Sequence, residues 1–302
     1  MDLDELLTRQ GGVVTRRQAL DSGLSARQLR RGPHRLVQVR HGVFADAAGL
    51  ADATPSARTA VAVAAALLVS DVELVAVGPT AAVVHGVPLL GPPPDRLHLA
   101  ERKPARPRHH GSSTTLHPAD VELVAGVRVT TLARTAVDVA RARGRAAGVV
   151  AADAVLARGV PREELEAVVE RMGRWSGVQQ ARAAVGFADG RSESPLESLG
   201  RLRFAEQGLP APQLQAWLGD EFGPVARVDH HWAAHRTIAE ADGALKYRNP
   251  ADVFEEKRRE DRLRDAGYEV VRYTWDEALH RPEVLAARVR RAFDRAARRR
   301  AA

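Results

Sequence analysis

The chain has 302 residues, of which 45% are hydrophobic and 27% are charged, and this composition excludes a mainly disordered protein. It contains no cysteine, which excludes disulfides, thiolate metal sites and thiol nucleophiles. The longest apolar run, Ala60 to Val69, is shorter than the roughly 20 residues needed to span a bilayer. The N-terminus is acidic rather than basic, unlike a signal peptide. These features predict a cytoplasmic protein with no membrane partner.

The net charge of +7 is concentrated in arginine-rich segments. Residues 15–41 contain seven arginines and one acid, and so do residues 288–302. Clustered positive charge is typical of proteins that bind the phosphates of nucleic acids, so we expect DNA as a partner. The alternative is a solvated surface in a protein from an arginine-rich genome.

Residues 1–50 are predicted to form a winged helix-turn-helix domain. Thr15 is a typical N-cap for a short helix, and Ser25 is a typical N-cap for a recognition helix over residues 26–31. Apolar residues on both sides of Arg40-His41-Gly42 predict a hairpin, the wing. The arginines expected to contact DNA are Arg27, Arg30, Arg31, Arg35 and Arg40. A small helical module that binds another protein remains the alternative.

Residues 51–189 predict a middle region that is mixed α/β at first and then helical. Short apolar runs suggest strands before residue 131, and four helices are expected at 132–142, 146–157, 162–172 and 178–187. The segment shows no compact catalytic constellation, and His109-His110 reads as part of a solvated loop.

Residues 190–302 predict a domain with the element order αβββαβα, which makes the whole chain an α+β multidomain protein. The expected helices are 194–207, 250–266 and 282–297. The expected strands are 213–218, 225–232, 236–241 and 268–274. Ser194 followed by Pro195 marks the start of the first helix, and Gly208 marks its end.

Three carboxylates lie at or near the ends of two predicted strands of this domain. Asp229 lies near the end of the second strand, and Glu240 and Asp242 lie at the end of the third. Residues two apart on a strand share a face, and a hairpin would bring Asp229 to the same place. Clustered carboxylates repel each other unless a cation joins them. Because Mg²⁺ prefers oxygen ligands, the pattern predicts Mg²⁺ held by Asp229, Glu240 and Asp242.

Two further residues are candidates for the same site, each with an alternative role. Lys246 is one of three lysines in the chain and follows Asp242 closely, so it is either a catalytic cation or a surface lysine. Glu197 completes an S-x-x-E capping box with Ser194, and it also has the position to reach a metal. His230 and His231 are neighbours on one strand, so they point to opposite faces and do not suggest a zinc site.

These residues carry a resemblance to known families. The stretches around Val228-Asp229, Glu240-Ala241-Asp242-Gly243, Gly267-Tyr268 and Trp275 resemble a domain similar to very-short-patch-repair endonucleases, which is like the PD-(D/E)XK nucleases in layout. The N-terminal segments Gly23-Leu24-Ser25 and Arg40 to Phe44 resemble the winged-helix domain of AbiEi-type antitoxins of toxin–antitoxin systems. The combination is similar to sets of actinobacterial proteins of unknown function.

The resemblance implies that Asp229 and Glu240 are metal ligands and that the chain hydrolyses phosphodiesters in DNA. Where this superfamily normally has lysine, two residues after the second acid, the chain has Asp242, and Lys246 would be a displaced equivalent. Two functions are therefore open. The first is a Mg²⁺-dependent endonuclease with a DNA-binding winged helix, and the second is a non-catalytic, antitoxin-like repressor that pairs with a protein toxin.

Overall fold

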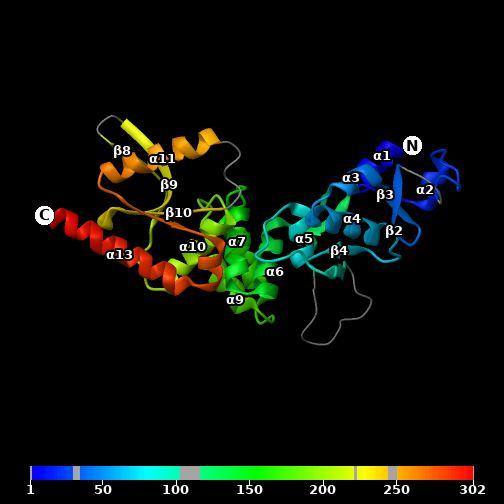
Figure 1. Ribbon diagram of the computed structural model, residues 1–302. Coiled ribbons are helices and arrows are strands. Elements are labelled where there is room, and N and C mark those ends of the chain that lie inside the picture. Colours follow the sequence, from blue (N-terminus) through cyan, green and yellow to red (C-terminus); the bar gives the residue numbers. More distant parts are fainter. Residues whose placement is uncertain (1, 30–34, 103–115, 221–222, 244–249, 302) are drawn as a thin grey trace. The chain divides into compact units, whose positions relative to one another are not determined.

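The computed structural model describes residues 2–29, 35–102, 116–220, 223–243 and 250–301, and divides the chain into two compact units (Figure 1). The first unit comprises Met1–Val155 and Gly159–Gly186, and the second comprises Leu156–Arg158 and Phe187–Ala302. Within the described ranges the protein is mixed α+β, with three small sheets and thirteen α-helices. No helix in these ranges is both long enough and apolar enough to cross a membrane.

The first unit begins with two short helices and a three-stranded sheet of order β1-β3-β2. The elements are α1 (Leu3–Arg9), β1 (Val13–Thr15), α2 (Arg16–Asp21), β2 (Leu36–Arg40) and β3 (Val43–Asp46). Thr15 caps α2 as predicted: its hydroxyl accepts from Gln18 N at 3.2 Å, and Gln18 Oε1 accepts from Thr15 N at 2.8 Å. Strands β2 and β3 form the antiparallel hairpin expected at residues 36–44.

The expected third helix is not a helix in the described residues. Residues 26–29 form a single turn, closed by a hydrogen bond from Leu29 N to Ser25 O at 3.2 Å. Ser25 does cap this turn, because its hydroxyl accepts from Gln28 N at 3.2 Å. Arg30 and Arg31, the rest of the prediction, lie outside the described residues.

A second sheet, of order β5-β4-β7-β6, follows in the first unit. The elements are α3 (Ala47–Ala51), α4 (Pro55–Leu68), β4 (Leu74–Ala76), α5 (Gly78–His85), β5 (Leu99–Glu101), β6 (Val121–Val124) and β7 (Val127–Thr130). One hydrophobic core contains Val13 and Val43 from the first sheet, Val63 from α4, and Val129 from β7. The first fifty residues therefore share their core with the segment that follows them.

Four helices come next, close to the predicted ranges: α6 (Leu132–Arg143), α7 (Arg145–Leu156), α8 (Arg162–Met172) and α9 (Val178–Phe187). Arg134 on α6 is only 2% exposed and lies between two buried aspartates. Its Nη1 is 2.8 Å from Asp120 Oδ2, and its Nε is 2.8 Å from Asp138 Oδ2. Arg171 and Arg141 contact the other oxygens of Asp120 and Asp138. Helices α6 and α8 are thus joined to the segment before β6 by a buried ion-pair network.

The second unit is a four-stranded sheet of order β11-β10-β9-β8 between helices (Figure 1). Helices α10 and α13 cover one face, and α11 covers the other. The bounds are α10 (Pro195–Glu206), β8 (Gln213–Asp220), β9 (Gly223–Trp232), β10 (Thr237–Ala241), α11 (Pro250–Asp265), β11 (Glu269–Tyr273), α12 (Trp275–His280) and α13 (Pro282–Ala301). The element order agrees with the predicted αβββαβα, with the short helix α12 in addition.

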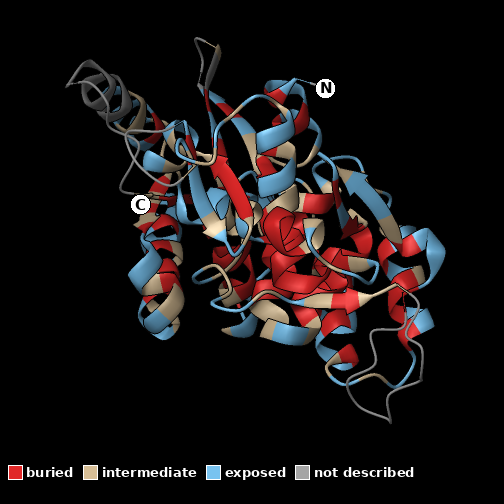
Figure 2. Cartoon of the chain, turned by 90° about the vertical axis from the view of Figure 1, so that its right-hand side faces the viewer, coloured by how far each residue is buried: buried red, intermediate tan, exposed pale blue. Residues whose placement is uncertain are grey.

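Burial along the helices explains how the second unit is held together. Helix α13 buries Leu285, Val289 and Ala296 and exposes most of its arginines, and this mixture is visible near the C-terminus in Figure 2. On α10, a Cβ at Gly200 would collide with the hydroxyl of Tyr273, a fully buried residue of β11. Glycine at this position lets α10 lie directly against the sheet, which fixes the start of α10 near the strands.

Candidate functional site

The arginines predicted to contact DNA lie at different parts of the N-terminal sheet and turn. Arg27 is exposed on the turn at residues 26–29, and Arg40 is exposed at the end of β2. Arg35, just before β2, forms an ion pair with Asp4 of α1. Arg30 and Arg31 lie outside the described residues. Arg16 and Arg17 on α2, which the prediction did not include, are also exposed. Their type and exposure suit phosphate contact, but arginines are so frequent here that composition alone does not single them out.

In the second unit, Asp229 on β9 and Glu240 on β10 occupy adjacent positions of two antiparallel strands. The ladder pairs Ala239 with His230 and ends there. The next main-chain donor, Ala241 N, binds the carboxylate of Asp229 instead, at 2.8 Å to Oδ2. The side chain of Asp229 therefore takes the place of a strand–strand hydrogen bond, at the point where β9 leaves β10.

A hydrogen-bond chain connects Asp229 to Glu197 at the start of α10. The amide nitrogen of Gln215 on β8 donates to Glu197 Oε2 at 2.8 Å and to Asp229 Oδ1 at 3.3 Å. Gln215 has a left-handed backbone, with φ of 51°. Non-glycine residues rarely adopt this conformation outside turns or functional sites. Sequence reasoning missed Gln215, since a lone glutamine in a strand carries no motif.

Glu197 has the capping role considered for it from sequence, and its reach to a metal stays a prediction. Its main-chain nitrogen donates to Ser194 Oγ at 3.2 Å, and its carboxylate accepts from Glu193 N at 2.9 Å, so it takes part in the helix cap. The same carboxylate accepts from Gln215 and is only 7% exposed. Burial, and secondly the negative charge of Asp229, raise the pKa of Glu197 above its ordinary value. The cap thus also belongs to the carboxylate cluster.

The remaining predicted residues lie on the side of the sheet that faces α11 or outside the described residues. Asp242 follows β10, and its Oδ2 lies 4.0 Å from Arg272 Nη1. Arg272 itself binds Glu260 of α11, at 2.8 Å between Nη2 and Oε2. Glu240 Oε2 lies 3.6 Å from Arg259 Nη2, also on α11. Lys246 is outside the described residues. Glu240 and Asp242 therefore both have arginine neighbours, and the sequence analysis did not assign these arginines to the site.

Two buried aromatic side chains of this domain, Tyr273 and His230, have pKa values shifted by burial and by the nearby carboxylates. The Tyr273 hydroxyl donates to Leu196 O at 3.3 Å. Burial raises the pKa of Tyr273 well above its ordinary value, and the charges of Asp229, Glu197 and Glu240 raise it further. Burial lowers the pKa of His230 to about 4, despite the opposing charge of Asp229. Three acids from α10, β9 and β10 therefore act on one buried region.

The two neighbouring histidines point away from each other, as expected from their positions on the strand. His230 packs against Phe204 with ring centroids 5.3 Å apart, and His231 packs against Tyr268 at 5.7 Å. Among the described residues, no three or more His, Asp or Glu side chains are grouped so that they could hold a metal ion by themselves. Metal binding by Asp229, Glu240 and Asp242 stays a prediction.

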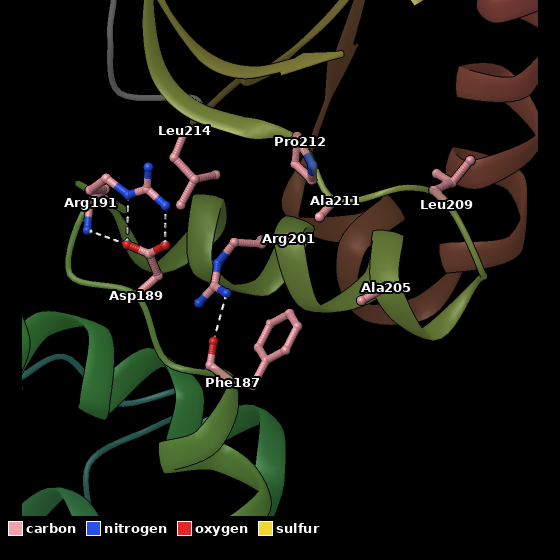
Figure 3. A pocket seen from close by; sticks show the side chains of 9 residues that line it. All are labelled: Phe187, Asp189, Arg191, Arg201, Ala205, Leu209, Ala211, Pro212 and Leu214. Carbon is pink, nitrogen blue, oxygen red and sulfur yellow. Dashed lines mark hydrogen bonds and ion pairs between the residues drawn. The ribbon is translucent and has the colours of Figure 1, made fainter. Parts of the chain in front are cut away.

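A cavity of about 280 Å³ lies at the start of the second unit (Figure 3). Arg191 holds Asp189 through two contacts, at 3.0 and 2.7 Å, and Arg201 donates to Phe187 O at 2.7 Å. The other side chains that line the cavity are largely apolar: Ala205, Leu209, Ala211, Pro212 and Leu214. Its lining includes none of the residues predicted for the carboxylate site.

No family model matches the chain, and no solved structure matches it. The chain is homologous to two proteins of Mycobacterium tuberculosis, MT2308 and Rv2248, which are both named as uncharacterized. It is 38% identical to each over 180 residues, and this region covers 59% of the present chain. The match spans 66% of each relative, just under two thirds of their length. These names state no activity.

Proposed function

We propose that this chain is a divalent-metal-dependent DNA endonuclease whose N-terminal module binds DNA. The observation that carries the proposal is the hydrogen-bonded cluster of Glu197, Gln215 and Asp229, in which Asp229 also accepts from Ala241 N, the residue after Glu240. Buried carboxylates are costly unless they are paired or coordinate a metal. Glu197 and Asp229 are joined through the neutral amide of Gln215, and we propose that a shared cation balances their like charges.

The donor set fits Mg²⁺. This ion binds proteins through one or two carboxylates and keeps several water molecules, so it does not need three side chains already in place. Asp229 and Glu240 would be its ligands, and the oxygens of Asp229 are already oriented by Ala241 N and Gln215. When bound, the metal supplies charge stabilisation for the phosphoryl oxygens and an acidified water. It would also offset the repulsion between Asp229 and Glu197 that raises the pKa of Glu197.

The chain's own groups have distinct tasks in this proposal. Gln215 orients both Asp229 and Glu197 through one amide nitrogen. Glu197, with its raised pKa, is suited to hold or release a proton near the water that attacks phosphorus. Lys246, which lies outside the described residues, is proposed as a further cation of the site. The fold corresponding to this proposal is a domain like the very-short-patch-repair endonucleases, joined to a winged helix like that of AbiEi-type antitoxins.

Two measurements test the proposal. Calorimetric titration with Mg²⁺ should show binding to the wild type, and the double variant Asp229→Asn, Glu240→Gln should show none. Supercoiled plasmid should be nicked or linearised in Mg²⁺ by the wild type and by Asp276→Asn, a control at an exposed ion pair with Arg281. It should stay supercoiled with Asp229→Asn or with EDTA. Cleavage that survives Asp229→Asn contradicts the proposal.

A second candidate function is favoured by the arginines near Glu240 and Asp242. Arg259 and Arg272 lie 3.6 and 4.0 Å from these acids, so they supply cations where the proposed nuclease needs a metal. An ion-paired domain of this kind would act as a scaffold in a DNA-binding, antitoxin-like repressor. The repressor would retard a duplex equally with and without Mg²⁺, and Asp229→Asn would leave its binding unchanged. Absence of Mg²⁺ binding together with such retardation selects this function.

A further inference from the structure

Arg259 of α11 lies beside Glu240 without forming a close hydrogen bond to it. Glu240 is 8% exposed, and its Oε2 is 3.6 Å from Arg259 Nη2. The other terminal nitrogen of Arg259, Nη1, donates to Arg227 O at a distance of 3.5 Å. Charge-assisted bonds from arginine to carboxylates are normally about 2.7–2.9 Å long. The Arg259 side chain is also one third exposed. Its guanidinium is therefore near a buried acid and yet loosely held.

Arg272 provides the contrast on the same side of the sheet. Its Nε and Nη2 lie 3.0 and 2.8 Å from Glu260 Oε2, so its guanidinium is fixed by an acid of α11. Glu260 also receives Arg264 at 2.6 Å. Arg272 and Arg264 thus have strong partners outside the carboxylate cluster. Of these three arginines, Arg259 is the one whose contacts permit an exchange of partner at low cost.

We propose that Arg259 is an exchangeable counter-ion of Glu240, which it neutralises when no metal is bound. This inference rests on the proposed function, because it requires a divalent cation at Asp229 and Glu240. The cation repels the guanidinium and takes over the charge of Glu240. Arg259 then turns outward and binds a phosphate of the DNA, since the planar guanidinium group can donate two parallel hydrogen bonds to two phosphate oxygens. The same side chain would therefore couple metal binding to DNA binding.

The first test is Mg²⁺ titration by calorimetry in the absence of DNA. Arg259→Gln removes the competing cation, so we expect Mg²⁺ to bind about threefold more tightly than to the wild type, the size of a partly exposed charge pair. Arg264→Gln is the matched control, because it removes an arginine five residues further along α11 that pairs with Glu260. The control should bind Mg²⁺ like the wild type. Thermal unfolding of each variant shows whether it is folded.

The second test is binding of a fluorescent duplex, with Ca²⁺ in place of Mg²⁺ to slow cleavage. With Ca²⁺, Arg259→Gln should bind more weakly than the wild type, and the slope of log affinity against log salt should fall by about 1. Without metal ion, the same variant should bind the duplex like the wild type, since Arg259 then faces Glu240. Arg259→Lys, which keeps the charge, should restore part of the affinity.

The outcomes separate the two proposals. If the wild type binds Mg²⁺ and Arg259→Gln binds it no more tightly, the exchange is overturned and the nuclease proposal stands. If neither the wild type nor Arg264→Gln binds Mg²⁺, both are overturned. Weaker duplex binding by Arg259→Gln in the absence of metal also overturns the exchange, because it would make Arg259 a permanent phosphate contact.

Discussion

Each unit buries charged side chains, but the two units compensate them differently. In the first unit, Arg134 lies between Asp120 and Asp138 at 2.8 Å from each. In the second, Glu197 and Asp229 are joined through the neutral amide of Gln215. The first arrangement balances opposite charges, whereas the second gathers charges of one sign. We therefore interpret the first as a support of the fold and the second as a site that a cation completes.

Removing the arginine from the balanced network should have the largest effect. Arg134→Leu leaves Asp120 and Asp138 buried without their shared cation, and we expect the first unit to lose about 3–5 kcal/mol of unfolding free energy. Trp175, which lies 5.2 Å from the Arg134 guanidinium, gives a local probe in urea denaturation. A loss below about 1 kcal/mol would show that the network does not support the fold.

The pH dependence of unfolding tests the buried charges of the second unit. His230 has its pKa lowered from 6.5 to about 4 in the folded state, so its contribution to stability is present above pH 6.5 and is lost as the pH falls toward 4. The unfolded chain takes up the proton first, which costs on the order of 3 kcal/mol across this window. His230→Gln should flatten the curve between pH 6.5 and 4. Parallel curves for the two proteins would contradict the shift.

Asp229→Asn should separate activity from stability. We expect at least about 100-fold slower plasmid cleavage, the loss typical when charge stabilisation is removed from a site. The unfolding free energy should change by less than about 1 kcal/mol, because relief of the repulsion with Glu197 offsets weaker hydrogen bonds to Ala241 N and Gln215. If urea denaturation instead shows that Asp229→Asn loses several kcal/mol of unfolding free energy, Asp229 supports the fold as Arg134 is expected to do.

The smallest effect is expected at an exposed ion pair of the first unit. Arg102 lies 2.8 Å from Glu73, with side chains 39% and 36% exposed. Arg102→Ala should therefore lower the unfolding free energy by no more than about 1 kcal/mol. The difference between the losses of unfolding free energy in Arg134→Leu and in Arg102→Ala shows how much of the loss is due to the burial of the ion pair rather than to the removal of an arginine.

Local signals predicted the secondary structure of the second unit well. Ser194, Pro195 and Gly208 mark the ends of α10, and the order of strands and helices after it agrees with the structure. The N-terminal prediction was right for the cap at Thr15 and for the hairpin of β2 and β3. It was wrong for residues 26–29, which form one turn, although Ser25 caps this turn and Leu29 packs against the N-terminal core.

That Glu197, Asp229, Glu240 and Asp242 share one site stays a prediction. What the sequence by itself determined is the order of the helix and strands that carry them, α10, β9 and β10. The sequence also determined the caps and turns, since these depend on residues a few positions apart. Only the tertiary structure decided that Gln215 joins Glu197 to Asp229, that Arg259 lies beside Glu240, and that Arg134 is buried between two aspartates. Apart from the i,i+4 pair of Arg134 with Asp138 inside α6, these contacts join residues that strand pairing and helix packing bring together, and no local pattern encodes them.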